Sequence, residues 1–180
     1  MPYSIGLYFD PPTDALVRQF WKQLAAEGLA EYYHLSGNRP HITLSLFEQT
    51  DCPKAQEALK ILSRTVHSFP VSFQFVGIFP GNISTVFWGL VVTQPLLDLH
   101  AKVYDCFCQF STRPNFNYYT PGHWIPHCGL AMEVKDKGLV ARIIDVCQSL
   151  PIPHQALVME VGLISFRPVK HLFSFSLIDV

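Results

Sequence analysis

An internal repeat is the feature of this sequence that most constrains its fold. His127 follows His41 by 86 residues (127 minus 41). The same offset aligns Leu44 with Leu130 and Phe87 with Phe173, and one residue of slippage aligns Val76-Gly77-Ile78 with Val161-Gly162-Leu163. Self-similarity over a long period is typical of duplicated supersecondary units. We therefore predict one bilobal domain over residues 1–180, made of two pseudo-twofold halves that change over near residue 94 and at the terminal strands.

Hydrophobic periodicity predicts the same order of elements in both halves: a helix, a histidine-bearing strand, a second helix and a strand pair. The predicted strands cover residues 3–9, 41–47, 70–79, 85–93, 124–134, 155–166 and 170–178. Two helices are predicted to begin after residue 13 and at about residue 53, and two more to cover about 96–110 and 136–150. Residues 111–122 are predicted to form an exposed loop. The fold class that follows is α+β.

Composition limits the class of protein. The chain has 49% hydrophobic and 15% charged residues, which is too apolar for a disordered protein. Its formal net charge of -1 argues against long nucleic acid as a partner, because nonspecific binding to a phosphate backbone needs a basic protein. A nucleotide or the terminus of an RNA remains a possible ligand.

The cysteines and the N-terminus bear on location. Five cysteines without a CxxC motif are more typical of reduced thiols than of a disulfide framework. No basic leader precedes Asp10, and no apolar stretch is long enough to cross a membrane. We expect a cytoplasmic monomer that has no contact with a membrane.

Two short motifs carry the candidate chemistry: Pro40-His41-Ile42-Thr43-Leu44 and Pro126-His127-Cys128-Gly129-Leu130. Residues i and i+2 of a strand share a face, so His41 lies with Thr43, and His127 with Gly129. If the halves pack about a pseudo-twofold axis, both histidines project into one cleft. Cleavage of a phosphodiester needs a base for the attacking hydroxyl and an acid for the leaving oxygen, and histidine performs both tasks near neutral pH.

The two motifs resemble those of the 2H phosphoesterase superfamily, which includes RNA 2′,3′-cyclic phosphodiesterases and 2′-5′ RNA ligases. The first motif matches the His-x-Thr/Ser pattern, whereas the second has Gly129 where the family has Thr or Ser. The resemblance implies two antiparallel sheets lining a central cleft, with helices outside. It implies catalysis by His41 and His127 without a metal or cofactor, and phosphate binding by Thr43.

Further residues near the motifs are candidates for substrate binding. Tyr119 and Trp124 flank the second motif and could stack on a nucleobase, although packing explains them equally well. Arg39 and Arg167 could attract phosphate, and solvated surface charges are the alternative. The i, i+4 spacing of His123 and His127 would suit zinc only on a helix, which Pro126 argues against. Cys128 faces away from His127 and is interpreted as packing rather than as a nucleophile.

The sequence thus predicts a metal-independent phosphodiesterase acting on cyclic phosphate or 2′-5′ bonds of nucleotides or RNA ends. Gly129 motivates an alternative, a nucleotide-binding or RNA-end-binding protein of the same fold without catalysis. An interaction protein without a ligand is the third hypothesis. On the sequence alone, the variant Gly129→Ser is expected to restore the missing hydroxyl.

Overall fold

The structure, a computed structural model, describes residues 2–115 and 117–179. Its strands are β1 (Tyr3–Phe9), β2 (His41–Phe47), β3 (Gln49–Thr50), β4 (Phe69–Phe79), β5 (Ser84–Leu90), β6 (Ser111–Thr112), β7 (His127–Val134), β8 (His154–Ser165) and β9 (Lys170–Ser176). Its helices are α1 (Pro11–Ala26), α2 (Tyr32–Leu35), α3 (Cys52–Ser63), α4 (Gln94–Cys108) and α5 (Lys137–Cys147). The predicted α+β class is confirmed. Positions 1, 116 and 180 of the predicted domain and loop lie outside the described residues.

The main sheet contains seven of the described strands, in the order β1-β2-β7-β5-β4-β8-β9, and its neighbouring strands are antiparallel. Strand β1 also pairs with β8, so six strands close into a ring. The sequence predicts two sheets, whereas the strands of both halves belong to this single sheet, and β3 with β6 form a small second one.

The physical reason for the single sheet is the length of β8. Its first residues, from His154 to Val158, pair with β4, and its later residues pair with β1 on one edge and β9 on the other. One strand thus runs through both halves. A bridge between Ile42 of β2 and Cys128 of β7 joins the halves a second time.

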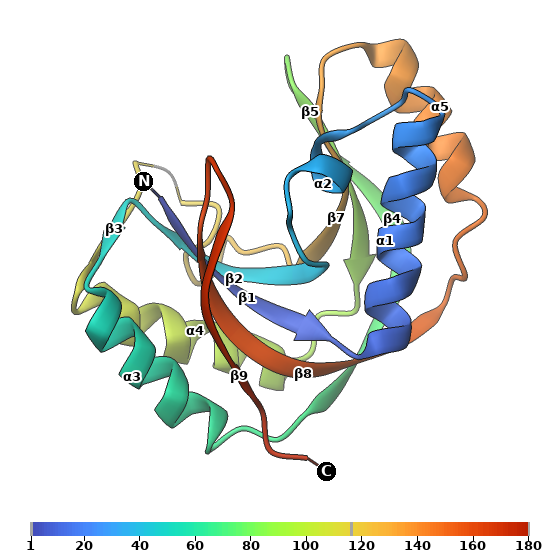
Figure 1. The fold of residues 1–180 in the computed structure, drawn as a ribbon. Coiled ribbons are helices and arrows are strands. Elements are labelled where there is room, and N and C mark those ends of the chain that lie inside the picture. The colour runs from blue at the N-terminus through green and yellow to red at the C-terminus, as the bar shows by residue number, and fades with distance from the viewer. Residues whose placement is uncertain (1, 116, 180) are drawn as a thin grey trace.

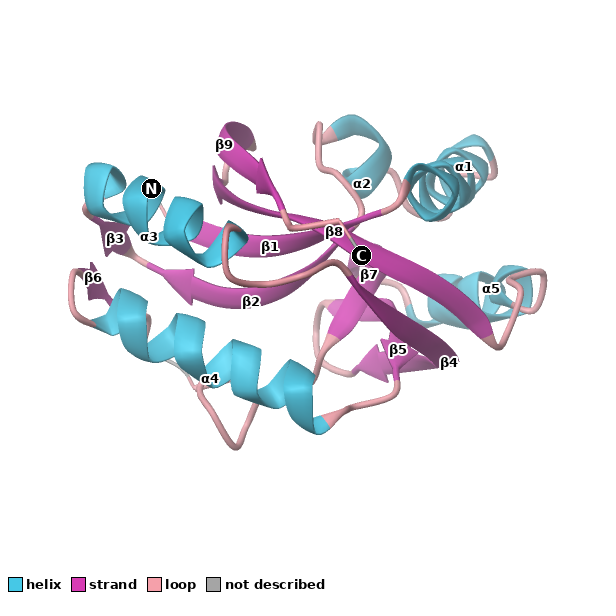
Figure 2. Ribbon diagram, turned by 90° about the horizontal axis from the view of Figure 1, so that it is seen from below, coloured by secondary structure: helices cyan, strands magenta, loops and turns pink. Residues whose placement is uncertain are grey.

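The helices pack on the outside in two groups (Figure 1). Helix α3 packs against β8 and β9, and α4 packs against β2. Helices α1 and α5 both contact β7, so α1 follows β1 in the chain but packs on a strand of the other half. Figure 2 shows the same division, with α3 and α4 on one side and α1, α2 and α5 on the other.

One buried apolar cluster connects the two halves. It includes Leu44 and Phe47 from β2, Trp88 from β5 and Leu130 from β7, together with the inner faces of the long helices. Along β2, buried Ile42 and Leu44 alternate with less buried His41 and Thr43. The strand alternation expected from the sequence therefore directs the two polar side chains away from the core.

Candidate active site

The two histidine motifs are neighbours in the sheet. Ile42 and Cys128 are antiparallel partners at the bridge between β2 and β7, and both are fully buried. Because the strands are antiparallel, this register brings His41 toward Gly129 and Thr43 toward His127 on the opposite face. The four motif positions therefore form one compact patch.

This patch lines a cavity of about 130 Å³, here named the histidine cavity. The sequence-predicted residues that line it are His41, Thr43, Tyr119, His127, Gly129 and Arg167. They come from β2, β7 and the loops before β7 and after β8, which are far apart in the sequence.

Each cavity histidine is held by the backbone two residues before it. His41 Nδ1 lies 2.6 Å from the carbonyl oxygen of Arg39, and His127 Nδ1 lies 2.7 Å from that of Ile125. A carbonyl oxygen only accepts hydrogen bonds, so Nδ1 must be the donor in both rings. The neutral tautomer is thereby set, and Nε2 keeps the lone pair that can accept a proton.

The pKa values of both imidazoles are lowered. Burial lowers the pKa of His41 from 6.5 to about 4, the Arg39 carbonyl opposes this shift, and the charge of nearby His127 adds to it. Burial also lowers the pKa of His127, against the opposing hydrogen bond to Ile125. Both rings are therefore neutral at pH 7 without a ligand, and an anion in the cavity would favour their protonated forms.

The strand backbone beside each histidine is tied to a tryptophan. Trp124 Nε1 donates to the carbonyl oxygen of Thr43 at 2.9 Å, and Trp21 Nε1 donates to that of Gly129 at 3.0 Å. The positions two residues after the histidines thus have matching support in the two halves.

Two predicted substrate-binding residues lie elsewhere. Arg39 is not among the residues lining the cavity, because its guanidinium makes two hydrogen bonds with Glu160 (2.9 and 3.0 Å) and lies 4.1 Å from the centre of the Tyr8 ring. Trp124 is also absent from the lining. Its buried indole stacks on His100 with 4.1 Å between the ring centres. Both residues position the motifs instead of facing the cavity.

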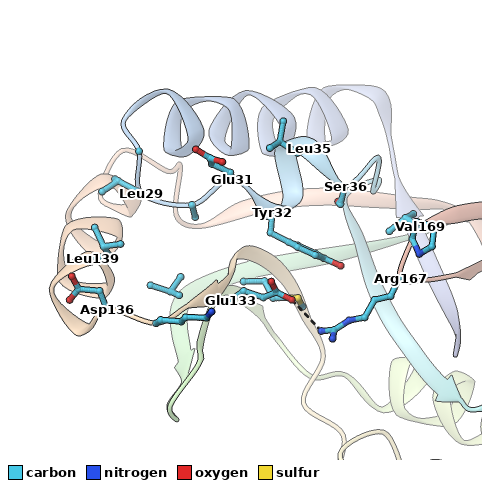
Figure 3. A pocket seen from close by; sticks show the side chains of 16 residues that line it. Leu29, Glu31, Tyr32, Leu35, Ser36, Glu133, Asp136, Leu139, Arg167 and Val169 are labelled. Atoms are coloured by element: carbon cyan, nitrogen blue, oxygen red, sulfur yellow. Dashed lines mark hydrogen bonds and ion pairs between the residues drawn. The ribbon is translucent and has the colours of Figure 1, made fainter. Parts of the chain in front are cut away.

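Arg167 marks the mouth of the histidine cavity. Its Nη2 lies 3.2 Å from Glu133 Oε1, and both residues have positive φ angles, 66° and 63°. Arg167 also lines a larger hollow of about 830 Å³, here named the outer groove, and Tyr32 and Met132 line both spaces. Figure 3 shows the side chains of Tyr32 and Arg167 in this groove, with the ion pair to Glu133 as a dashed line. The cavity and the groove are therefore contiguous.

Eight of the residues that line the cavity were not predicted from the sequence, among them the polar Ser4, Tyr33 and Asn38. Ser4 Oγ and Asn38 Oδ1 are buried without a hydrogen-bond partner among the described residues. Buried polar atoms are usually paired, so these two atoms favour a polar ligand. Tyr33 precedes His41 by the same eight residues by which Tyr119 precedes His127. The repeat offset could have identified Tyr33, whereas only the fold brings Ser4 to the site.

The thiol of Cys128 is buried on the far face of β7, and burial raises its pKa to about 12. It is therefore not a thiolate at neutral pH, in agreement with its interpretation as packing. In the described residues, no group of three or more His, Cys, Asp or Glu side chains could hold a metal ion. Likewise, none of the helices in the described ranges has the length and apolarity to span a membrane.

Comparison with known families agrees with this arrangement. The profile of the 2′-5′ RNA ligase superfamily matches residues 11–169. The chain belongs to the 2′-5′ RNA ligase superfamily. Its membership confirms the resemblance to 2H phosphoesterases seen in the two motifs. A search of curated proteins found no match.

Several solved structures share the superfamily fold at low sequence identity. A protein of Thermus thermophilus has a TM-score of 0.63 at 15% identity, with 98% of each chain covered. Escherichia coli LigT, complexed with 3′-AMP, has a TM-score of 0.57 at 13% identity, covering 98% of this chain and 97% of LigT. Kluyveromyces marxianus Usb1 has a TM-score of 0.50 at 13% identity, covering 95% of this chain and 97% of Usb1. These likenesses establish the fold.

Proposed function

We propose that this chain is a metal-independent phosphodiesterase that hydrolyses cyclic phosphate or 2′-5′-type bonds in nucleotides or RNA ends. His41 and His127 are its acid and base catalysts. The observation that carries the proposal is that both imidazoles line one cavity with Nδ1 bonded to a backbone carbonyl, which leaves Nε2 for proton transfer.

The proposed reaction on a 2′,3′-cyclic phosphate needs two proton transfers. Nε2 of one neutral imidazole takes a proton from water as the water oxygen attacks phosphorus. The other imidazole, protonated at Nε2, gives its proton to the ribose oxygen as the bond from that oxygen to phosphorus breaks. The product is a phosphate monoester, and the two rings have exchanged protonation states.

The depressed pKa values suggest which ring has which role. The pKa of His41 falls to about 4, a large shift, while that of His127 is also lowered. Burial thus keeps His41 unprotonated at neutral pH, which is the state that a general base requires. We assign His41 as the base and His127 as the acid in hydrolysis.

The remaining candidates have binding roles in this proposal. The Thr43 hydroxyl donates to a nonbridging phosphate oxygen, and Gly129 and Tyr119 border the same phosphate. Arg167 lies at the mouth, where it attracts the anion. The outer groove then holds the rest of a nucleotide or RNA end. The crystal complexes of LigT with 3′-AMP, ATP and NADP+ support nucleotides as the ligand class.

The matched contacts of the two histidine motifs also support our proposal that residues 1–180 form one bilobal unit of two duplicated halves. Matching Nδ1 bonds hold His41 and His127, and matching indole bonds reach Thr43 and Gly129. Equivalent surroundings at the repeat offset are what a duplicated unit would retain.

The variants His41→Ala and His127→Ala test the proposal. Each is expected to lower kcat for a nucleoside 2′,3′-cyclic phosphate by about 10²- to 10⁴-fold in the presence of a chelator, since each removes one proton transfer. His67→Ala, which removes an exposed histidine outside the cavity, is the matched control and should keep full rate. Wild-type turnover in either cavity variant would refute the pairing, and loss of wild-type activity with chelator would refute metal independence.

The second candidate is a nucleotide-binding or RNA-end-binding protein without turnover. Gly129 favours it, because the second motif has no side-chain hydroxyl of its own. Tight binding of 3′-AMP, together with no hydrolysis across a panel of cyclic nucleotides and short 2′-5′ and cyclic-ended RNAs, would support binding alone.

A further inference from the structure

The space beside Gly129 is already occupied by Tyr33. A Cβ atom built on Gly129 would overlap the hydroxyl oxygen of Tyr33 and approach its Cζ to 2.5 Å. The hydroxyl of Tyr33 therefore lies on the cavity face of β7, where the side chain of a Thr or Ser at position 129 would begin. Both residues line the histidine cavity.

The ring of Tyr33 is fixed in this position by its neighbours. It stacks on Trp21 with 4.8 Å between ring centres and 12° between planes, and Tyr32 packs edge-on at 5.4 Å. Trp21 in turn donates its indole N–H to the carbonyl oxygen of Gly129. A hydroxyl on such a clamped ring is preorganised, which is what an effective phosphate donor needs.

The repeat gives Tyr33 a counterpart. Tyr33 and Tyr119 each stand eight residues before a cavity histidine. In the first motif, the Thr43 side chain interacts with the Tyr119 hydroxyl and opposes the rise in its pKa that burial causes. In the second motif Gly129 has no side chain that could interact with the Tyr33 hydroxyl in the same way.

We propose that the Tyr33 hydroxyl donates a hydrogen bond to a nonbridging phosphate oxygen and so replaces the hydroxyl that the second motif lacks. The inference rests on the proposed function, since it names a further substrate-binding residue of that site. Burial raises the pKa of Tyr33 well above 10, so its hydroxyl keeps its proton across the working pH range. Gly129 is then the residue that makes room for a donor from α2.

The variant Tyr33→Phe removes this hydroxyl and leaves the ring stacked on Trp21. With inorganic phosphate as the probe, titration calorimetry is expected to give a Kd about tenfold weaker than wild type, with an unchanged Tm. Thr43→Val should weaken phosphate binding to a similar extent. Tyr104→Phe removes a hydroxyl from a buried tyrosine outside the cavity and should bind phosphate as wild type does.

A second pair of variants tests whether Tyr33 occupies the space in which a hydroxyl of the second motif would lie, whereas Tyr33→Phe tests the hydrogen bond itself. Gly129→Ser should weaken phosphate binding in the wild-type background, because the new side chain collides with Tyr33. In a Tyr33→Ala background, the same substitution should strengthen phosphate binding, because the serine hydroxyl then has room. If Tyr33→Ala does not fold, Tyr33→Phe alone decides the question.

If Tyr33→Phe binds phosphate as tightly as wild type, the inference is overturned. The proposed function would still stand in that case if His41→Ala and His127→Ala are inactive. Weaker phosphate binding by Tyr33→Phe, in a protein that hydrolyses none of the cyclic substrates, would support the inference while the proposed catalysis fails. Absence of phosphate binding by the wild-type protein would contradict both.

Discussion

At the scale of single residues, the backbone carbonyls of Arg39 and Ile125 determine how the cavity histidines can act. They engage Nδ1 of His41 and of His127, so Nε2 is the atom left for a substrate. The motif spacing predicted that the two rings share a cavity. Their tautomers could not be predicted from the sequence, because they depend on how each chain segment turns into its strand.

The lowered pKa values predict an acidic optimum for kcat/KM, which reports on the free protein. Activity should fall below about pH 4, where His41 becomes protonated and can no longer accept a proton. It should also fall as pH rises through the pKa of His127, which lies below 6.5, because the acid loses its proton. The maximum therefore lies between about pH 4 and 6.5. A pH series at low substrate concentration measures it, and a maximum above about pH 7 would contradict this electrostatic account.

At Gly129 the structure changes what a substitution is expected to do. Restoring a hydroxyl by Gly129→Ser was expected to complete the second motif, but Tyr33 occupies that space. We predict that Gly129→Ser lowers the free energy of unfolding by about 1–3 kcal/mol, as overpacked sites do. Urea unfolding measures the change. A serine variant as stable as wild type would show that Tyr33 moves aside freely.

At the scale of elements, Asp10 joins α1 to β8. One carboxylate oxygen accepts the N–H of Thr13 at 2.8 Å and caps the helix, and the other accepts the N–H of Leu157. The sequence predicted a helix that follows residue 13, whereas the helix begins at Pro11 with Asp10 as its N-cap. The second bond, to a residue 147 positions later, could not be read from local sequence.

The variant Asp10→Ala is predicted to lower the free energy of unfolding by about 1–2 kcal/mol through loss of the cap. Burial raises the pKa of Asp10, but hydrogen bonds from Leu157 and Thr13 outweigh it and the net pKa is lowered below 3.8. A lowered pKa means that the carboxylate stabilises the fold fully above about pH 3.8 and loses this effect as pH falls further. The difference in stability between wild type and variant should therefore shrink in acid. A constant difference down to about pH 2 would argue against the carboxylate as its source.

At the scale of the whole molecule, the repeat in the sequence predicted the two histidine strands and the helices around them. It did not predict how the terminal strands enter the sheet. Strand β1 lies between β2 and β8 in one half, just as β5 lies between β7 and β4 in the other. Among the described strands, β9 pairs only with β8, at the end of the strand order. Phe173 therefore does not occupy the place in the sheet that its alignment with Phe87 suggested. Local patterns do not specify such long-range pairing.

The continuous sheet and the shared core predict that the two halves unfold together. Strand β8 pairs with strands of both halves, and one buried cluster includes residues of both. Far-UV and near-UV circular dichroism in urea should give coincident single transitions. Two separate transitions would show that the halves are independently stable.

The central claim is that His41 and His127 act on the same phosphate, and NMR titration of the two imidazoles tests it most directly. Inorganic phosphate bound between them should raise the pKa of both rings, since a bound anion favours each protonated form. The signals are assigned with His41→Gln and His127→Gln. The account predicts that both pKa values rise on saturation with phosphate, and a shift in only one ring, or in neither, would contradict it.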